Sequence, residues 1–159
     1  MEATTQQRGV REIFGEHHRK LERMFEEVLE TLRAGDVREA ARQWSALDRE
    51  LDQHMALEER EMLPQLAASE RAAVEQIRAE HAEIRARVAE LGAAVDLHRI
   101  TEAQAKALFD RLRAHAANED ALLYRRADLF RDRGSLLERL LHLGDRRRSA
   151  QSPPEQGGA

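Results

Sequence analysis

The feature that most constrains the fold is an internal repeat of histidines on apolar helical stripes. His81 lies 63 residues after His18, and His115 lies 61 residues after His54. Apolar residues recur at matching offsets around His18 and His81, four residues before each and three, seven, ten and fourteen residues after. Such spacings place side chains on one face of an α-helix. The sequence therefore predicts two related helical hairpins, each carrying histidines on an apolar stripe.

The second helix of each hairpin adds a carboxylate to its histidine. His54 is followed four residues later by Glu58, and His115 is followed four residues later by Glu119. Residues four apart lie one turn apart on one helix face, so both side chains of a pair can reach a shared centre. One such pair alone is typical of a surface contact or a hydrogen-bonded histidine, but two matching pairs with two further histidines in register favour a metal site. The predicted ligands are His18, His54, Glu58, His81, His115 and Glu119.

Local signals define the first two helices. A helical pattern runs from about Gly9 to Ala34, and Gly35 is expected to end it. Asp36 is a plausible N-cap for a second helix that runs to about residue 63. Pro64 should stop or kink that helix, because proline lacks the backbone N–H and its ring collides with the preceding turn.

Similar signals define the later helices. Ser69 is expected to cap a third helix that continues to about Leu97. Thr101 opens a fourth helix that reaches roughly Phe130. A short fifth helix is expected over about residues 134–144.

These elements predict one all-α domain. Four long helices with short connections favour an antiparallel up-down-up-down four-helix bundle with a short C-terminal fifth helix. We expect residues 1–8 to be a flexible lead, residues 9–144 to form the domain and residues 145–159 to be a disordered tail. A bundle of this kind can present ligands from all four helices to one central point.

Composition narrows the chemistry. The chain has no cysteine, which excludes disulfides, thiolate clusters and cysteine nucleophiles. The net charge is −4, and no basic stripe is interleaved with aromatic residues, so nothing supports nucleic-acid binding. No apolar run reaches the length of a membrane span and the N-terminus lacks a signal pattern, so we expect no membrane segment and a cytoplasmic location.

The predicted ligand set indicates which metals suit the site. Four imidazoles and two carboxylates without thiolate favour iron or manganese, and zinc is also possible. Two histidines for each metal, with the glutamates bridging, leave coordination positions open for oxygen species or water. Bridging carboxylates also offset the charge of two cations, which makes such a cluster tolerable inside an apolar bundle.

Several polar neighbours flank the predicted ligands. The repeat aligns His18 rather than His17 with the third helix, so His17 is expected at the rim or beside a ligand. The acidic neighbours Glu59, Glu61 and Asp120 are expected to face solvent, with Glu61 and Asp120 as reserve ligands. Tyr124 is expected at the rim of the site.

Four segments together resemble a known family. The segments EHHRKLERMF, HMALEEREMLP, EHAEIRARV and HAANEDALLYRRA are similar to the four helices of hemerythrin-like, HHE cation-binding domains, over about residues 10–130. The resemblance implies a non-haem centre of two iron ions with an oxo or hydroxo bridge inside a four-helix bundle. Its motif positions match His18, His54, Glu58, His81, His115 and a carboxylate after His115.

The resemblance also exposes a departure from the oxygen-carrying branch. Those proteins have a second histidine one turn before the ligand of the third helix, where this chain has Ile77. They place the last carboxylate five residues after the histidine, at Asp120, whereas the repeat favours Glu119. The missing imidazole would give one iron an extra open position, which argues against simple reversible oxygen carriage.

Three functions compete at this point. We expect a non-haem di-iron protein that binds or senses oxygen, nitric oxide or iron, because the ligand set is rich in nitrogen and leaves positions open. A di-iron peroxidase or nitric-oxide-processing enzyme is the first alternative, since an extra open position suits peroxide activation. A metal-free helical interaction module is the second. No segment identifies a protein partner, so the expected partner is a small diatomic ligand or peroxide.

Overall fold

The computed structural model describes residues 9–126, and these residues are almost entirely helical. They contain no β-strand, so the all-α prediction is confirmed for this part of the chain. The expected fifth helix and both expected tails lie outside the described residues. The elements are α1 (Val10–Ala34), α2 (Val37–Leu57), the π-helical turn η1 (Glu58–Met62), α3 (Leu63–Leu66), α4 (Arg71–Asp96) and α5 (Glu102–Arg125).

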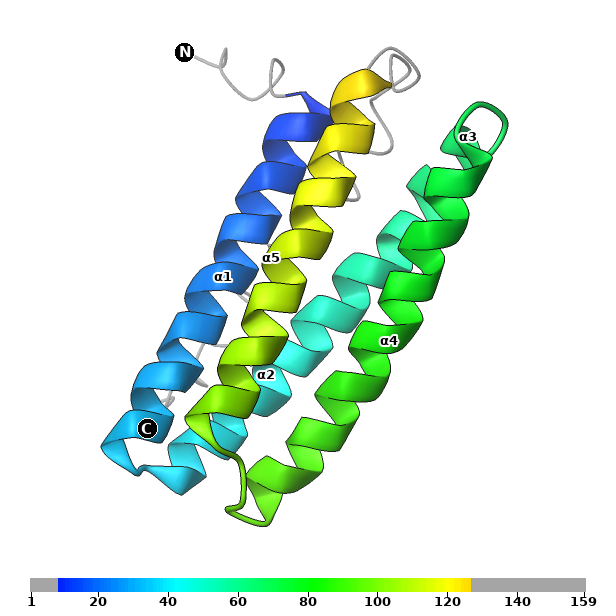
Figure 1. Ribbon diagram of the computed structural model, residues 1–159. Helices are drawn as coiled ribbons and strands as arrows, with labels where there is room; N and C mark the ends of the chain where they lie inside the picture. The colour runs from blue at the N-terminus through cyan, green and yellow to red at the C-terminus, as the bar shows by residue number, and fades with distance from the viewer. Residues whose placement is uncertain (1–8, 127–159) are drawn as a thin grey trace, which may run out of the picture.

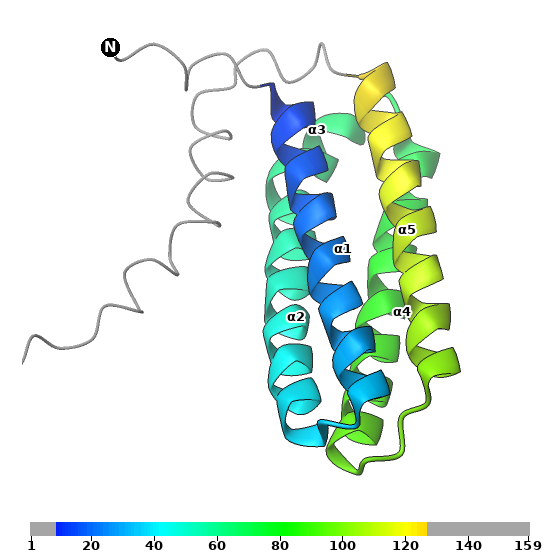
Figure 2. The ribbon, with the colours of Figure 1, turned by 90° about the vertical axis from the view of Figure 1, so that its left-hand side faces the viewer.

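The four long helices lie side by side. Helix α1 packs against α2 and α5, and α4 packs against the same two helices, so the four surround a common interior. The α1–α2 and α4–α5 connections lie at one end of the molecule, and the connection from α3 to α4 lies at the other (Figures 1 and 2). Residues from all four helices can therefore meet midway along the interior.

The first corner forms as its sequence predicts. Gly35 has φ 77°, a left-handed conformation that glycine adopts without a Cβ clash, and α1 ends there. The Asp36 carboxylate then accepts a hydrogen bond of 3.0 Å from the Glu39 backbone N–H and caps α2.

The predicted cap of the third long helix is wrong. Helix α4 begins at Arg71 with Glu70 at the N-cap position, and no side chain caps it. The backbone N–H groups of Ser69 and Glu70 both donate to the Leu66 carbonyl, at 3.2 and 2.8 Å. Ser69 is thus part of the turn that closes α3, which puts it one residue too early to cap α4.

The cap of the fourth long helix is a reciprocal one. The Thr101 hydroxyl accepts a hydrogen bond from the Gln104 backbone N–H, while the Gln104 side chain accepts one from the Thr101 backbone N–H. The predicted start of this helix is confirmed. Its expected extension to Phe130 lies outside the described residues.

Pro64 changes the winding of the second helix without ending it. Regular α-helix stops at Leu57, a π-helical turn covers Glu58–Met62, and helical structure continues to Leu66. In a regular helix the Pro64 ring would meet the Arg60 carbonyl, and a wider turn with one extra residue relieves that contact. The Leu63 N–H accordingly donates to the Glu58 carbonyl, five residues back. Of the two predicted outcomes at Pro64, a stop is therefore wrong, because helical structure continues to Leu66.

Two apolar clusters fill the interior, one on each side of a polar layer. One cluster contains Phe14, Leu66, Ile77 and Leu122, and the other contains Phe25, Trp44, Val88 and Phe109. On α1, α4 and α5, the predicted histidine and glutamate ligands fall between the residues of the first cluster and those of the second. Along α2 and the turn η1, His54 and Glu58 flank Met55 and Leu57, where the second cluster gives way to the first. The clusters thus hold the polar layer in place from both ends.

None of the described helices combines the length and the apolar character that a membrane crossing requires.

The Thr101 cap provides a test of this helix boundary. We expect Thr101→Ala to lower the free energy of unfolding by about 1 kcal/mol, because the Gln104 N–H loses its acceptor. Chemical denaturation in the presence of a chelator measures this loss. Ser45→Ala removes a hydroxyl from an exposed position within α2 and serves as the control, with an expected change under about 0.5 kcal/mol. Equal effects of the two substitutions would contradict the capping role.

Candidate metal centre

The structure brings all six predicted ligands together in the polar layer. Their donor atoms form two groups of four, and within each group the atoms lie within 4.8 Å of one another. Both groups contain Glu58 and Glu119, so the two carboxylates are shared. The groups are His18, His54, Glu58 and Glu119, and Glu58, His81, His115 and Glu119.

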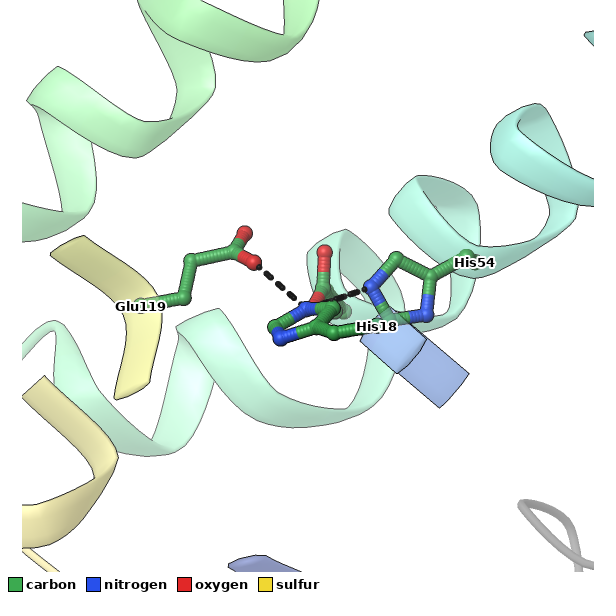
Figure 3. A group of neighbouring side chains, drawn as sticks. His18, His54 and Glu119 are labelled. Atoms are coloured by element: carbon green, nitrogen blue, oxygen red, sulfur yellow. Dashed lines mark hydrogen bonds and ion pairs between the residues drawn. The ribbon is translucent and has the colours of Figure 1, made fainter. Parts of the chain in front are cut away.

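Each shared carboxylate turns one oxygen toward each hairpin. Glu58 places Oε1 3.0 Å from His54 Nε2 and Oε2 3.3 Å from His81 Nε2. Glu119 places Oε1 3.1 Å from His81 Nε2 and Oε2 3.1 Å from His18 Nε2. Figure 3 shows the His18 ring between His54 and Glu119, with interactions to both. Each of these carboxylates therefore contacts histidines of both hairpins.

Several of these short distances lack the geometry of hydrogen bonds. His115 Nε2 lies 2.9 Å from Glu119 Oε1, yet His115 Nε2, Glu58 Oε2 and Glu119 Oε2 have no hydrogen-bond partner among the described residues. The Nε2 atoms of His18 and His54 also face each other at 3.0 Å. Buried donors and acceptors are normally paired. Buried donor atoms that lie this close together and are left without partners are typical of the ligands of a cation, so the His/Glu cluster fits a metal site.

Two outer carboxylates hold the histidines of the second hairpin. Glu59 Oε1 lies 2.8 Å from His81 Nδ1, and Glu80 Oε2 lies 2.7 Å from His115 Nδ1. Such contacts fix the ring orientation and raise the basicity of a ligating imidazole. The expectation that Glu59 faces solvent is wrong, because it is half-buried and paired with His81 and Arg85.

Sequence reasoning did not identify Glu80. It is 6% exposed and accepts hydrogen bonds from Gln76 and Asn118 besides its contact with His115. A usable signal was present, because Glu80 follows Ile77 by three residues and so borders the apolar stripe of α4.

The reserve ligands lie beside the two groups. Asp120 Oδ1 is 3.4 Å from His18 Nδ1, and the Asp120 side chain is 48% exposed, so Asp120 is not a member of either group. Glu61 accepts a hydrogen bond of 2.9 Å from Arg60 and also belongs to neither group. His17 packs beside His54, with ring centroids 5.9 Å apart. The side chain of Tyr124 is outside the described part of the structure.

The electrostatics couple the histidines to the carboxylates. Burial acts to lower the pKa of His18, but contacts with Asp120 and Glu119 outweigh it and raise that pKa to about 10. Burial likewise acts to lower the pKa of His81, but contacts with Glu119 and Glu58 outweigh this effect and raise that pKa to about 10. Burial would raise the pKa of Glu119, yet His115, His18 and His81 hold it well below its usual 4.5. Without a cation, protons on His18 and His81 therefore balance the negative charge of the carboxylates.

His17 behaves in the opposite way. Burial, His54 and Lys20 together lower the pKa of His17 to about 4. This histidine is therefore neutral at physiological pH, although it lies next to the cluster.

A cavity of about 270 Å³ approaches the cluster between α1, α2 and α5. His18, His54, His115 and Asp120 line its polar part. Apolar side chains form most of the remaining wall, among them Leu21, Phe25, Leu47, Leu51, Met55 and Phe109. Arg113 lies at its rim, ion-paired with Glu22 and with its guanidinium carbon 4.0 Å from the centroid of the Phe109 ring. The cluster thus faces a mostly apolar chamber on one side.

The family model of the hemerythrin HHE cation-binding domain matches this chain over residues 10–127. Comparisons with curated proteins and with solved structures gave no match.

The protonated histidines of the metal-free protein make its stability depend on pH. Because the folded pKa values of His18 and His81 exceed the usual 6.5, their stabilising contribution is complete below pH 6.5 and is lost as the pH rises toward 10. The lowered pKa of Glu119 gives stability that is present above pH 4.5 and lost in acid. We therefore expect the melting temperature of the metal-free protein to be highest between pH 4.5 and pH 6.5.

Bound metal should reverse that trend, because a cation must displace the histidine protons and so binds more tightly as the pH rises. Melting temperatures measured with chelator and with excess Zn²⁺, from about pH 5 to about pH 9, test both statements. His18→Gln should flatten the metal-free slope, and His98→Gln, at an exposed position, should not. A metal-free melting temperature that does not change with pH would contradict the prediction.

Proposed function

Because the chain belongs to the hemerythrin HHE cation-binding domain family, we propose that it is a non-haem iron protein whose antiparallel four-helix bundle holds two iron ions. Its proposed role is to bind or sense a small ligand such as oxygen or nitric oxide at that centre. The proposed ligands are His18 and His54 for one ion, His81 and His115 for the other, and Glu58 and Glu119 for both.

One observation carries this proposal: two groups of four donors share both carboxylates. A single-ion site would use one group and leave the histidines of the other hairpin buried without a role. Two imidazole nitrogens and two carboxylate oxygens at each ion also leave positions open for an outside ligand. Iron suits this mixture of nitrogen and oxygen donors, which contains no sulfur.

The iron pair would supply a place for a diatomic ligand to bind and electrons for its reduction. The residues of the chain do the rest. Glu58 and Glu119 offset cationic charge in an apolar interior, where isolated charge is costly. Glu59 and Glu80 accept from the Nδ1 atoms of His81 and His115, which directs their Nε2 atoms inward. The apolar clusters keep bulk water from both ends of the layer.

The surroundings of Ile77 indicate the side on which a ligand can bind. Ile77 is 3% exposed and lies with Glu58, Glu119 and Leu122 around a void of only about 10 Å³. A void of this size is at the lower limit for one water molecule. The face that would carry an extra histidine in oxygen carriers is therefore closed by hydrocarbon. The cavity beside His18 and His54 offers the room instead.

Iron loading tests the proposal. We expect purified protein that is loaded with Fe²⁺ without oxygen and then exposed to air to hold two irons per chain. A near-ultraviolet absorption band typical of an oxygen-bridged iron pair should accompany them. His81→Ala should abolish the band, because His81 Nε2 faces both shared carboxylates, whereas His98→Ala at an exposed turn should preserve it. A wild-type chain that takes up no iron would contradict the proposal, as the metal-free module predicts.

The cavity favours a second candidate, processing of peroxide. Its volume of about 270 Å³ is several times the roughly 30 Å³ that a water molecule occupies in the liquid. A diatomic ligand needs little of this room, whereas peroxides with an organic group could use it. We expect iron-loaded protein of this kind to consume peroxide when an added reductant supplies the two electrons and solvent the two protons for each O–O bond that is cleaved. Ala116→Phe should slow that reaction without loss of iron, because Ala116 lines the cavity.

Ala114→Phe is the matched control for this second candidate. Ala114 lies on the same helix at an exposed position and does not line the cavity, so its replacement should leave turnover unchanged. Reversible ligand binding by the wild type with no peroxide consumption would exclude the enzyme and retain the binding protein.

A further inference from the structure

The cavity beside the cluster opens to solvent between α1 and α5. The residues of α2 that line it are all buried, namely Leu47, Leu51, His54 and Met55. The exposed residues of its lining lie on α1 or α5, namely Arg19, Arg113 and Ala117. These two helices run side by side (Figures 1 and 2), so a molecule can enter the cavity through the seam between them.

Small residues keep this seam open. Gly15 of α1 lines the cavity opposite Ala116 and Ala117 of α5. A glycine inside a helix costs about 1 kcal/mol relative to alanine, so its presence calls for a reason. Close packing is not that reason, because a Cβ at Gly15 would meet the Arg19 Nη1 atom at 3.5 Å, an ordinary van der Waals distance. The missing side chain leaves the entrance to the cavity wider.

Hydrocarbon surface remains accessible inside the cavity. Leu21 and Leu112 line it and are only partly buried, although both pack against the second apolar cluster. Covering apolar surface of this kind stabilises a complex by about 25 cal/mol for each Å² removed from water. The wall of the cavity therefore favours an apolar occupant.

The size of the cavity limits that occupant. Its volume is about 270 Å³. A cavity of roughly 150 Å³ is large enough to bind benzene, whereas pockets for drug-sized molecules begin at about 300 Å³. The cavity therefore has room for a benzene ring with a small alkyl group, but not for a much larger molecule.

The charges at the entrance cancel. Two arginines and two acidic residues line this part of the cavity, namely Arg19, Arg113, Glu22 and Asp120. Arg113 is already paired with Glu22, with 2.6 Å between Nη2 and Oε1. An ion that entered the apolar chamber would lose its hydration without gaining a net opposite charge. The entrance therefore favours a neutral molecule.

One end of the cavity offers a place for a hydroxyl group. His18 and Asp120 both line it, with His18 Nδ1 3.4 Å from Asp120 Oδ1. The Nδ1 atom is buried and has no hydrogen-bond partner among the described residues, although buried donors are normally paired. A hydroxyl group between the two residues can accept from the imidazole N–H and donate to the carboxylate.

We propose that the cavity is a binding site for a neutral organic molecule with an apolar body larger than benzene and one hydroxyl or hydroperoxyl end. The apolar body lies between α1, α2 and α5, and the oxygen end lies between His18 and Asp120. This inference goes beyond the proposed function, because such binding requires no iron. It also gives the second candidate function a substrate class, the organic hydroperoxides.

A calorimetric titration of the full chain with 2-phenyl-2-propanol tests the proposal. This probe combines a benzene ring, a small branched alkyl group and one hydroxyl, and it is not reduced at a metal. We expect one molecule to bind per chain, both with chelator and with excess Zn²⁺. With chelator, the similar anion 2-phenylpropanoate should bind at least about 10-fold more weakly, because its charge must be desolvated.

Two variants test whether the probe occupies the cavity. Ala116→Phe fills the space and should weaken binding by at least about 10-fold, whereas Ala114→Phe, at an exposed position outside the lining, should not. Gly15→Leu narrows the entrance and should also weaken binding. It favours the helix, since leucine has the higher helix propensity, so it retains the test if Ala116→Phe prevents folding. Arg23→Leu adds a leucine to an exposed site of α1 outside the lining and is its control.

A further variant tests the oxygen end. Asp120→Ala should weaken binding of the alcohol by about 10-fold, because a hydrogen bond to a charged group contributes about 1.5–3 kcal/mol. It should not weaken binding of isopropylbenzene, which has the same apolar body without the hydroxyl. Equal losses for the two probes would show that Asp120 does not bind the hydroxyl and would overturn the proposed orientation.

Three results would overturn the site itself. They are no binding of the alcohol to the wild type, binding that is unchanged in both Ala116→Phe and Gly15→Leu, and tighter binding of the carboxylate than of the alcohol. The two-iron centre stands or falls separately. A chain that binds the alcohol but takes up no iron would keep this site and lose that centre, and a chain that takes up iron but binds no alcohol would do the reverse.

Discussion

The structure depends on two carboxylates that each belong to both halves of the molecule. Glu58 and Glu119 lie between the histidines of the two hairpins, with one oxygen directed to each. Three buried imidazoles and that of His18, whose side chain is 11% exposed, surround these two carboxylates. Such a layer costs free energy unless its charges are balanced. Protons on the histidines balance them in the absence of metal, and cations would balance them in its presence. Protons and metal ions therefore compete for the same nitrogen atoms.

The apolar clusters make that layer possible, because they set its depth and its orientation. A histidine on a helix can turn away to solvent unless residues above and below it on the same stripe are buried. Here Phe14 precedes His18 on α1 and Phe25 follows it, each in a different cluster. The π-helical turn after Leu57 also helps to orient the layer, because Glu58 and Glu59 both lie in this turn and both contact His81 of α4. The site is thus held by packing on two sides rather than by a loop.

The grouping of the six predicted ligands could be anticipated from the sequence, because residues at helical spacing point in the same direction. Residues four apart on a regular helix share a face whatever the rest of the fold does, so His54 with Glu58 and His115 with Glu119 needed no tertiary information. Glycine at position 35 and threonine at position 101 marked helix ends for equally local reasons. All six predicted ligands lie in the two donor groups.

The outer contacts could not be predicted in the same way. Glu59 meets His81 and Glu80 meets His115 across helix interfaces, at distances that depend on how far and at what angle the helices approach. A charged residue next to an apolar stripe usually reaches solvent, so the place of Glu80 beside its stripe showed that it could face inward but not that it would contact His115. The prediction that Ser69 caps the third long helix was wrong for a related reason. The π-helical turn and α3 extend the second helix, so α4 begins only at Arg71.

The six residues of the cluster follow the internal repeat, whereas the residues that contact their histidines from outside follow it only in part. The number of histidines that each residue contacts explains this difference. Changing Glu58 or Glu119 would alter both proposed metal positions at once, since each carboxylate contacts histidines of both hairpins. Changing an outer residue alters one imidazole only. His17 can therefore occupy in the first hairpin the position that Glu80 occupies in the second. The repeat also aligns the ion pair of Glu22 and Arg113 with that of Arg85 and Asp52, with the charges reversed. Neither difference alters the shared cluster. A duplicated scaffold of this kind can vary its outer contacts while the shared His/Glu cluster stays the same.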